Sequence, residues 1–252
     1  MSYLIVALIL LSWFLIFWNI YIKTRKASLV DLAWSLSFSL VALFFLSTRN
    51  EVPDLLFFSS FLSWSLRLGI FLGVTRFVIN KKEDQRYEDM KTDNEAADKT
   101  KFLYVYLFQA LTVLLLTLPW HNYSASTHSN YYMIFIVLAN LCIIGEFISD
   151  WQLFQFKSLA HNKGKVCKQG LWKYSRHPNY FFELSFWFSM SLAYLSICNS
   201  YIHFISFILM TYFILYFSGI KRMEGKTSTT RSKEYQDYVE KTSSLIPWFP
   251  KK

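Results

Sequence analysis

The chain of 252 residues has few of the residues that build loops and disulfide frameworks. It contains seven glycines, five prolines and three cysteines. Cys142, Cys167 and Cys198 are odd in number and lack metal-ligand spacing, as do the five histidines, so neither a disulfide nor a metal site is predicted. Gly69 and Gly73 form a Gly-x-x-x-Gly pair, which predicts close packing of a neighbouring helix.

Charge and the motifs of common enzyme classes are scarce as well. Charged residues make up only 17% of the chain. There is no Gly-x-Gly-x-x-Gly fingerprint and no Walker loop, so a nucleotide would be held by side chains on helices and loops rather than by a glycine-rich turn. No nucleophile motif and no internal repeat occurs in the sequence.

Long apolar runs dominate what is present. Hydrophobic residues form 54% of the chain and aromatic residues 20%, and the mean hydropathy is positive. A helix that crosses a bilayer needs about 20 mainly apolar residues. The predicted fold class is therefore all-α, a polytopic membrane protein with about seven transmembrane helices, near residues 4–22, 29–47, 55–79, 102–120, 131–153, 180–198 and 201–219.

The net charge of +9 reflects membrane topology rather than a nucleic-acid partner. Of the 26 lysines and arginines, 24 lie at the C-terminal ends of the first, third, fifth and seventh runs or in the segments that follow them. Arg49 lies on the opposite side, and Arg67 lies within the third run. By the positive-inside rule, the N-terminus is predicted outside and the C-terminus in the cytoplasm.

A single integral-membrane domain is predicted over residues 1–252, with a cytoplasmic tail over 220–252. The tail mixes lysines with aromatic residues such as Trp248 and Phe249. This combination is typical of segments that lie on the membrane interface. The loop 80–101 is predicted to form a short surface helix or a hairpin.

Residues 170–187 carry the most informative pattern. A basic and aromatic stretch leads to Pro178, which suits the first position of a helix because its missing N–H is not needed there. Asn179, Glu183 and Trp187 follow at intervals of four residues and share one face of the predicted helix. An amide and a carboxylate on one stripe of an apolar helix predict a site.

Other ionisable side chains lie inside the apolar runs, where they are costly and functional by default. Glu146 and Asp150 share a helix face in the fifth run, and Arg67 lies within the third. A structural alternative stays open, in which Glu146 pairs with Arg67 and Asp150 lies at the interface. Asp31 is either a helix cap or a site residue.

Basic side chains precede the predicted helix. The planar guanidinium of Arg176 matches a phosphate in two-pronged geometry, and the helix that starts at Pro178 adds the positive end of its dipole. An arginine that only snorkels to the interface is the alternative. Histidine is the side chain that ordinarily titrates near neutrality, which makes His177 an acid–base candidate.

The chain resembles the steroid 5-alpha-reductase superfamily, specifically a mostly bacterial branch. The central resemblance is the run Gly170-Leu-Trp-x-Tyr-Ser-Arg-His-Pro-Asn-Tyr-Phe-x-Glu183. Other matching pieces follow in order from about residue 30: Val30-Asp31-x-x-Trp34, Trp64-x-x-Arg67-Leu68, Glu83-Asp84-x-Arg86-Tyr87, Gly145-Glu146-x-x-x-Asp150-x-Gln152, and the tail motifs Ser218-Gly-Ile-x-x-x-Glu224, Tyr235-x-x-Tyr238 and Thr242-Ser-x-x-Ile246-Pro247.

The resemblance implies a seven-helix bundle that binds NADPH from the cytoplasm and reduces a conjugated double bond in a lipophilic substrate. It implies cofactor contacts at Arg67, Asp150, Lys157, Asn179 and Glu183.

Two residues depart from the pattern of the superfamily. Phe182 stands where the family usually has glycine, and Trp64 stands where the steroid-reducing members carry a tyrosine. The Arg-His-Pro-x-Tyr element also occurs in isoprenylcysteine carboxyl methyltransferases, which bind S-adenosylmethionine. Those enzymes usually carry a paired-glutamate signature, of which only Glu224 is found here.

The resulting hypothesis is a membrane-embedded NAD(P)H-dependent reductase of an alkene or enone in a steroid- or isoprenoid-like substrate. The phosphates are assigned to Lys157, Lys173 and Arg176. Asn179, Glu183 and Asp150 are assigned to the amide and ribose groups, and Arg67 to the acids or the pyrophosphate. Tyr174, His177 and Tyr180 are the unranked candidates for the proton donor.

The alternatives are an S-adenosylmethionine-dependent methyltransferase and a non-catalytic transporter or scaffold. The predicted partners are a lipophilic small molecule and the lipid bilayer, with no metal and no nucleic acid. The membrane is predicted to be the bacterial inner membrane, or the endoplasmic reticulum in a eukaryote.

Overall fold

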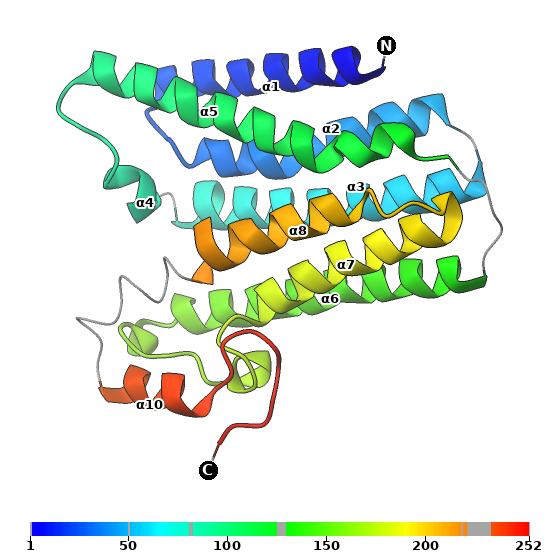
Figure 1. Ribbon diagram of the computed structural model, residues 1–252. Coiled ribbons are helices and arrows are strands. Elements are labelled where there is room, and N and C mark those ends of the chain that lie inside the picture. Colours follow the sequence, from blue (N-terminus) through cyan, green and yellow to red (C-terminus); the bar gives the residue numbers. More distant parts are fainter. Residues whose placement is uncertain are drawn as a thin grey trace. The chain divides into compact units, whose positions relative to one another are not determined.

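The structure is a computed structural model that describes residues 2–49, 51–80, 83–124, 130–217, 219–220 and 233–251. Helices form most of the described residues, and no strand occurs among them (Figure 1). Six of the described helices are long and apolar enough to cross a membrane. The protein is therefore an all-α, multi-pass integral membrane protein, and the predicted fold class is confirmed.

The chain divides into two compact units, Met1–Ser126 and Thr127–Lys252. The elements of the first unit are α1 (Ser2–Thr24), α2 (Leu29–Thr48), α3 (Val52–Leu72) with its π-helical continuation η1 (Gly73–Asn80), α4 (Gln85–Glu88), α5 (Glu95–Thr117) and the 3₁₀ turn η2 (Leu118–Asn122).

Close packing of α2 against α3 holds the first unit together. A Cβ atom added to Gly69 would lie 2.3 Å from Leu36 Cδ2, whereas one added to Gly73 would lie 3.8 Å from its nearest neighbour. The predicted close approach is therefore confirmed at Gly69. Nearby, the hydroxyl groups of Ser39 and Ser65 lie 2.6 Å apart, and such interhelical hydrogen bonds support helix association in lipid.

η1 and the segment that follows it contact the start of α2. Arg76, Arg86 and Tyr87 all donate hydrogen bonds to the Asp31 carboxylate. Asp31 therefore joins two elements, a role beyond that of a simple helix cap.

Asp84 belongs to the same cluster. Burial alone would raise the pKa of the Asp84 carboxyl, but hydrogen bonds and positive charge from Arg86 outweigh this effect and lower the pKa to about 2. The Asp84 carboxylate therefore stays ionised across the neutral range.

The second unit is built on the antiparallel pair of long helices, α6 and α7. Its elements are α6 (Asn130–Ser158), the 3₁₀ turns η3 (Ala160–Asn162) and η4 (Gly170–Lys173), α7 (Pro178–Cys198), α8 (Phe204–Tyr212) with the π-helical stretch η5 (Phe213–Phe217), and α10 (Lys233–Lys241) in the tail.

Two of the predicted runs differ in extent from the observed helices. The run expected at 102–120 belongs to a helix that already begins at Glu95, because the Asn94 side chain accepts the Ala97 N–H and caps two polar turns that hydropathy does not detect. The seventh run is shorter than a full span in the described residues, which contain an apolar helix at Phe204–Phe217. Within loop 80–101, Gln85–Glu88 forms the short helix α4, as predicted, and residues from Glu95 onward belong to α5.

Candidate functional site

The start of α7 organises the site. The helix begins at Pro178, as the sequence predicts, and the Phe181 N–H donates to the carbonyl of the N-cap residue His177, four residues earlier. The Ser175 hydroxyl accepts the His177 N–H at 3.1 Å, which turns the chain into the helix. The local sequence therefore orients the first turn of α7.

A polar pair joins α7 to α6 at this point. The Asn179 side chain donates a hydrogen bond of 3.1 Å to the Asp150 carboxylate, which comes from the last third of α6. The side-chain amide oxygen of Asn179 (Oδ1, called here the Asn179 carbonyl) is buried and has no hydrogen-bond partner among the described residues. A buried acceptor without a donor is costly in free energy, so this oxygen is suited to a ligand N–H or O–H group.

Glu183 lies one turn further into α7. Its side chain is 7% exposed and accepts a hydrogen bond of 3.1 Å from the indole N–H of Trp187. Asn179, Glu183 and Trp187 therefore follow one face, as the four-residue spacing predicts. The sequence did not predict the hydrogen bond between Glu183 and Trp187 on the same helix.

The Phe182 ring of α7 packs closely against Gly145 of α6. A Cβ atom added to Gly145 would lie 2.5 Å from Phe182 Cε1. A large side chain on α7 and a missing side chain on α6 are therefore complementary. This contact lies beside Glu146 and Glu183, so it sets the separation of the two helices at the level of the acidic side chains.

The turn η4 is docked onto α6 by two hydrogen bonds. The Gln152 amide oxygen accepts the Leu171 N–H at 2.9 Å, and the Trp172 indole donates to the Ser149 carbonyl at 2.9 Å. Gly170 adopts φ of +55°, and a Cβ atom there would lie 2.5 Å from the Gln152 amide. Glycine is therefore required at position 170 for both its backbone angle and its contact.

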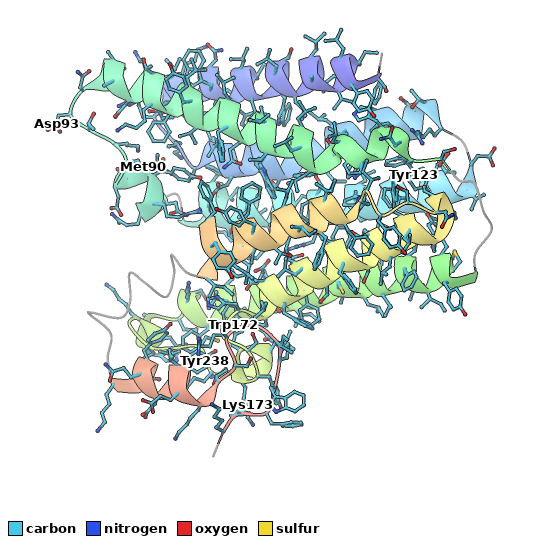
Figure 2. The ribbon with its side chains drawn as sticks, in the orientation of Figure 1. Met90, Asp93, Tyr123, Trp172, Lys173 and Tyr238 are labelled. Atoms are coloured by element: carbon cyan, nitrogen blue, oxygen red, sulfur yellow. The ribbon has the colours of Figure 1, made fainter. Side chains whose placement is uncertain are left out.

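The tail closes over the loop that precedes α7. Arg176 Nη1 donates to the carbonyl groups of Val239 and Thr242, at 2.7 and 3.0 Å. The buried Tyr238 hydroxyl donates to the Trp172 carbonyl, and burial raises the pKa of this hydroxyl, which therefore stays protonated (Figure 2). The structure thus gives Arg176 a tail contact that the sequence reasoning missed. The sequence signal for this contact was the pattern of aromatic and threonine residues in the tail.

The three candidate proton donors have different surroundings. His177 is 6% exposed, and its ring stacks on that of Tyr180 with centroids 5.5 Å apart. Tyr174 instead contacts the tail, where its ring meets Phe249 edge-on at 5.9 Å. His177 and Tyr180 therefore form a unit at the start of α7, and Tyr174 belongs to the tail contact.

The remaining predicted cofactor-binding residues are Lys157, Lys173 and Arg67. Lys157, at the end of α6, and Lys173, in η4, are exposed. Arg67 is half-buried on α3 and belongs to the first unit, so its assigned role stays a prediction. Across the described residues, no three His, Cys, Asp or Glu side chains gather as they would around a metal ion.

The arrangement offers hydrogen-bond acceptors in apolar surroundings at a helix N-terminus. Asp150, Glu183 and the Asn179 carbonyl can accept hydrogen bonds from amide and hydroxyl groups. The first turn of α7 carries the positive end of the helix dipole, which favours a negative group. The local chemistry therefore suits a ligand that combines hydrogen-bond donors with an anionic portion.

Comparison with known proteins places the chain in a family. No curated protein and no solved structure matches it. A family model, described as protein of unknown function (DUF1295), matches residues 17–242, which is most of the chain. The chain therefore belongs to this family, DUF1295.

Proposed function

We propose that this protein is a membrane-embedded reductase that uses NAD(P)H to reduce a carbon–carbon double bond in a lipophilic, steroid- or isoprenoid-like substrate. The observation that carries the proposal is the Asn179–Asp150 pair at the start of α7, with the Asn179 carbonyl buried and open to a donor. The resemblance of residues 170–183 to the steroid 5-alpha-reductase superfamily supports the same conclusion.

The residues present fit a nicotinamide dinucleotide. The Asn179 carbonyl and the carboxylates of Asp150 and Glu183 can accept hydrogen bonds from carboxamide and ribose groups. Lys157 and Lys173 are exposed cations that can meet the phosphates. Arg176 would act mainly by holding the tail closed, since its guanidinium donates to tail carbonyl groups.

When bound, NADPH would supply two electrons and one hydrogen to the double bond. The chain must then deliver a proton to the second carbon and keep water away. The stacked pair His177 and Tyr180 is favoured as the proton source, because both rings lie at the start of α7, whereas Tyr174 is engaged by the tail. The tail docked by Tyr238 would exclude water from the loop before α7, which strengthens the polar interactions inside.

The substrate class follows from the location of the site in a membrane protein. A lipophilic alkene or enone dissolves in the bilayer and can reach the helices from the side. Trp64, which stands where the steroid-reducing members carry a tyrosine, is fully buried and packs edge-on against Phe38 at 5.2 Å. An indole ring cannot replace a phenol as an acid, so the substrate is not assigned to the steroids themselves.

Orientation and membrane follow the same proposal. The positive-inside rule puts the tail and the start of α7 in the cytoplasm, where NADPH is available. The membrane would be the inner membrane of a bacterium, or the endoplasmic reticulum in a eukaryote.

Cofactor binding to the purified full-length protein tests the proposal. NADPH should raise the unfolding temperature in detergent, and S-adenosylmethionine should not. Asn179→Ala should weaken NADPH binding about tenfold, because one hydrogen bond to a buried acceptor contributes about 1–1.5 kcal/mol. Gln155→Ala, which changes an exposed amide on α6, is the matched control and should bind normally.

Two results would contradict the proposal. Stabilisation by S-adenosylmethionine alone would indicate the methyltransferase alternative. Unchanged NADPH affinity in both Asn179→Ala and Glu183→Gln would show that the cofactor binds elsewhere.

A further inference from the structure

The last residues of the described tail expose large apolar side chains. Ile246, Trp248 and Phe249 are 63%, 71% and 78% exposed. Three such side chains within four residues form a contiguous apolar tip. Exposed apolar patches of this kind mark a surface that meets a membrane or a partner.

The backbone of this segment is fixed, so the tip is presented by the fold. The Arg176 N–H donates to the Ser243 carbonyl at 2.8 Å, and the Trp248 N–H donates to the Tyr174 carbonyl at 2.9 Å. The Lys251 N–H donates to the Lys241 carbonyl at 2.9 Å, which closes the segment back onto α10. These bonds hold the side chains of the tip outward.

The tip lies beside the first turn of a membrane-spanning helix. The residues that bind the tail, Tyr174 to Arg176, immediately precede Pro178, where α7 begins. Figure 1 shows the C-terminal coil next to this end of α7 within the second unit. Because α7 is long and apolar enough to cross the bilayer, its first turn lies at the level of the lipid headgroups.

Exposed lysines occur in the segments next to the tip. Lys173, Lys241 and Lys251 are exposed. The Lys173 ammonium lies 5.7 Å from the ring centroid of Tyr174, which in turn contacts Phe249. Aromatic side chains flanked by lysines match the interface between acyl chains and anionic headgroups.

We propose that Ile246, Trp248 and Phe249 insert into the bilayer leaflet at the N-terminal end of α7, and that Lys173 and Lys251 bind the phosphates of anionic lipids there. The occupant is the bilayer because the tip adjoins the start of a membrane-spanning helix and has three exposed lysines in the segments next to it. The lipid contact would hold the tail in place over Ser175 and Arg176. The inference does not depend on the proposed reductase activity.

Quenching of tryptophan fluorescence in nanodiscs tests the insertion. Lipids brominated on the upper acyl chain should quench a component of the wild-type emission that is missing in Trp248→Phe. Trp172→Phe is the matched control, because Trp172 is 8% exposed and docked on α6, and it should retain that component. A Trp248 component that is equal with and without bromine would overturn the proposal. A Trp248 emission component that changes with protein concentration in detergent would also overturn it, because it would indicate that a second copy of the chain covers the tip.

Hydrogen exchange of backbone amides measures the contribution of lipid charge to tail binding without relying on tryptophan fluorescence. In nanodiscs that contain phosphatidylglycerol, the Trp248 N–H should exchange more slowly than in phosphatidylcholine alone. Lys251→Glu should reduce this protection about fivefold, because one lysine near an anionic lipid surface contributes about that factor. Lys163→Glu, on the exposed loop after η3, should leave the protection unchanged. Protection that is independent of lipid charge would refute the phosphate contacts.

Discussion

The close fit of Gly145 and Phe182 predicts that Gly145→Ala changes the stability of the protein in opposite directions with and without the Phe182 ring. In the wild type, a methyl group at position 145 would lie 2.5 to 2.7 Å from three atoms of the Phe182 ring. Carbon atoms in contact lie about 3.5–4.0 Å apart, so the ring would have to retreat by about 1 Å. The ring or the two helices must therefore move.

The cost can be compared with the gain in helix propensity. Overpacking a fitted contact costs about 1–3 kcal/mol, and replacing glycine by alanine within a helix contributes about 1 kcal/mol in the other direction. Gly145→Ala alone should therefore destabilise the protein by up to about 2 kcal/mol. In a Phe182→Ala background the ring is absent, and the same substitution should stabilise by up to about 1 kcal/mol.

A double-mutant cycle on the detergent-solubilised protein measures this reversal. The unfolding free energy of the wild type, the two single variants and the double variant gives the coupling, expected at about 1–3 kcal/mol. Gly73→Ala is the control for propensity alone, because its new methyl group would lie 3.8 Å from the nearest atom. Equal destabilisation by Gly145→Ala in both backgrounds would refute the packing argument. A coupled loss of NADPH affinity would link the helix separation to the proposed site.

Three further predictions address other parts of the structure. Gly69→Ala should lower the unfolding temperature, because the new methyl group would lie 2.3 Å from Leu36 Cδ2, and a normal temperature would show that α2 and α3 separate easily. Tyr238→Phe should speed proteolysis of the tail, since the hydroxyl bonds to two carbonyl groups; unchanged cleavage would argue against its docking role. The lowered pKa of Asp84 stabilises the fold above pH ~4 by roughly 2 kcal/mol, and this contribution is lost as pH falls from about 4 to about 2. Asp84→Asn should therefore flatten the acid dependence of unfolding in that window, and an unaltered slope would contradict the assignment to the Arg86 contact.

Local chemistry predicts much of the second unit. Proline at position 178 and the polar residues before it predict the start of α7. The repeat of 3.6 residues places Asn179, Glu183 and Trp187 on one face, and the structure has them there. These features depend on neighbours within a few residues, so the sequence displays them directly.

The contacts that turn this face into a site come from distant segments. The bond from Asn179 to Asp150 joins residues 29 apart, and the bonds from Arg176 to Val239 and Thr242 join residues more than 60 apart. No local pattern specifies such pairings, because they depend on how the helices and tail pack. Arg176 is an example. Its charge predicts contact with an anion, but in the fold its guanidinium donates hydrogen bonds to carbonyl groups of the tail.

The sequence by itself determined that this protein is a helical, multi-pass membrane protein with polar residues at the head of α7, because hydropathy and helical period act locally. Tertiary structure alone decided what those residues meet. It set Phe182 against Gly145, η4 against Gln152, and the tail over the loop before α7. The physical reason is that burial and hydrogen bonding are satisfied between elements, and each side chain's partner is chosen only when those elements pack.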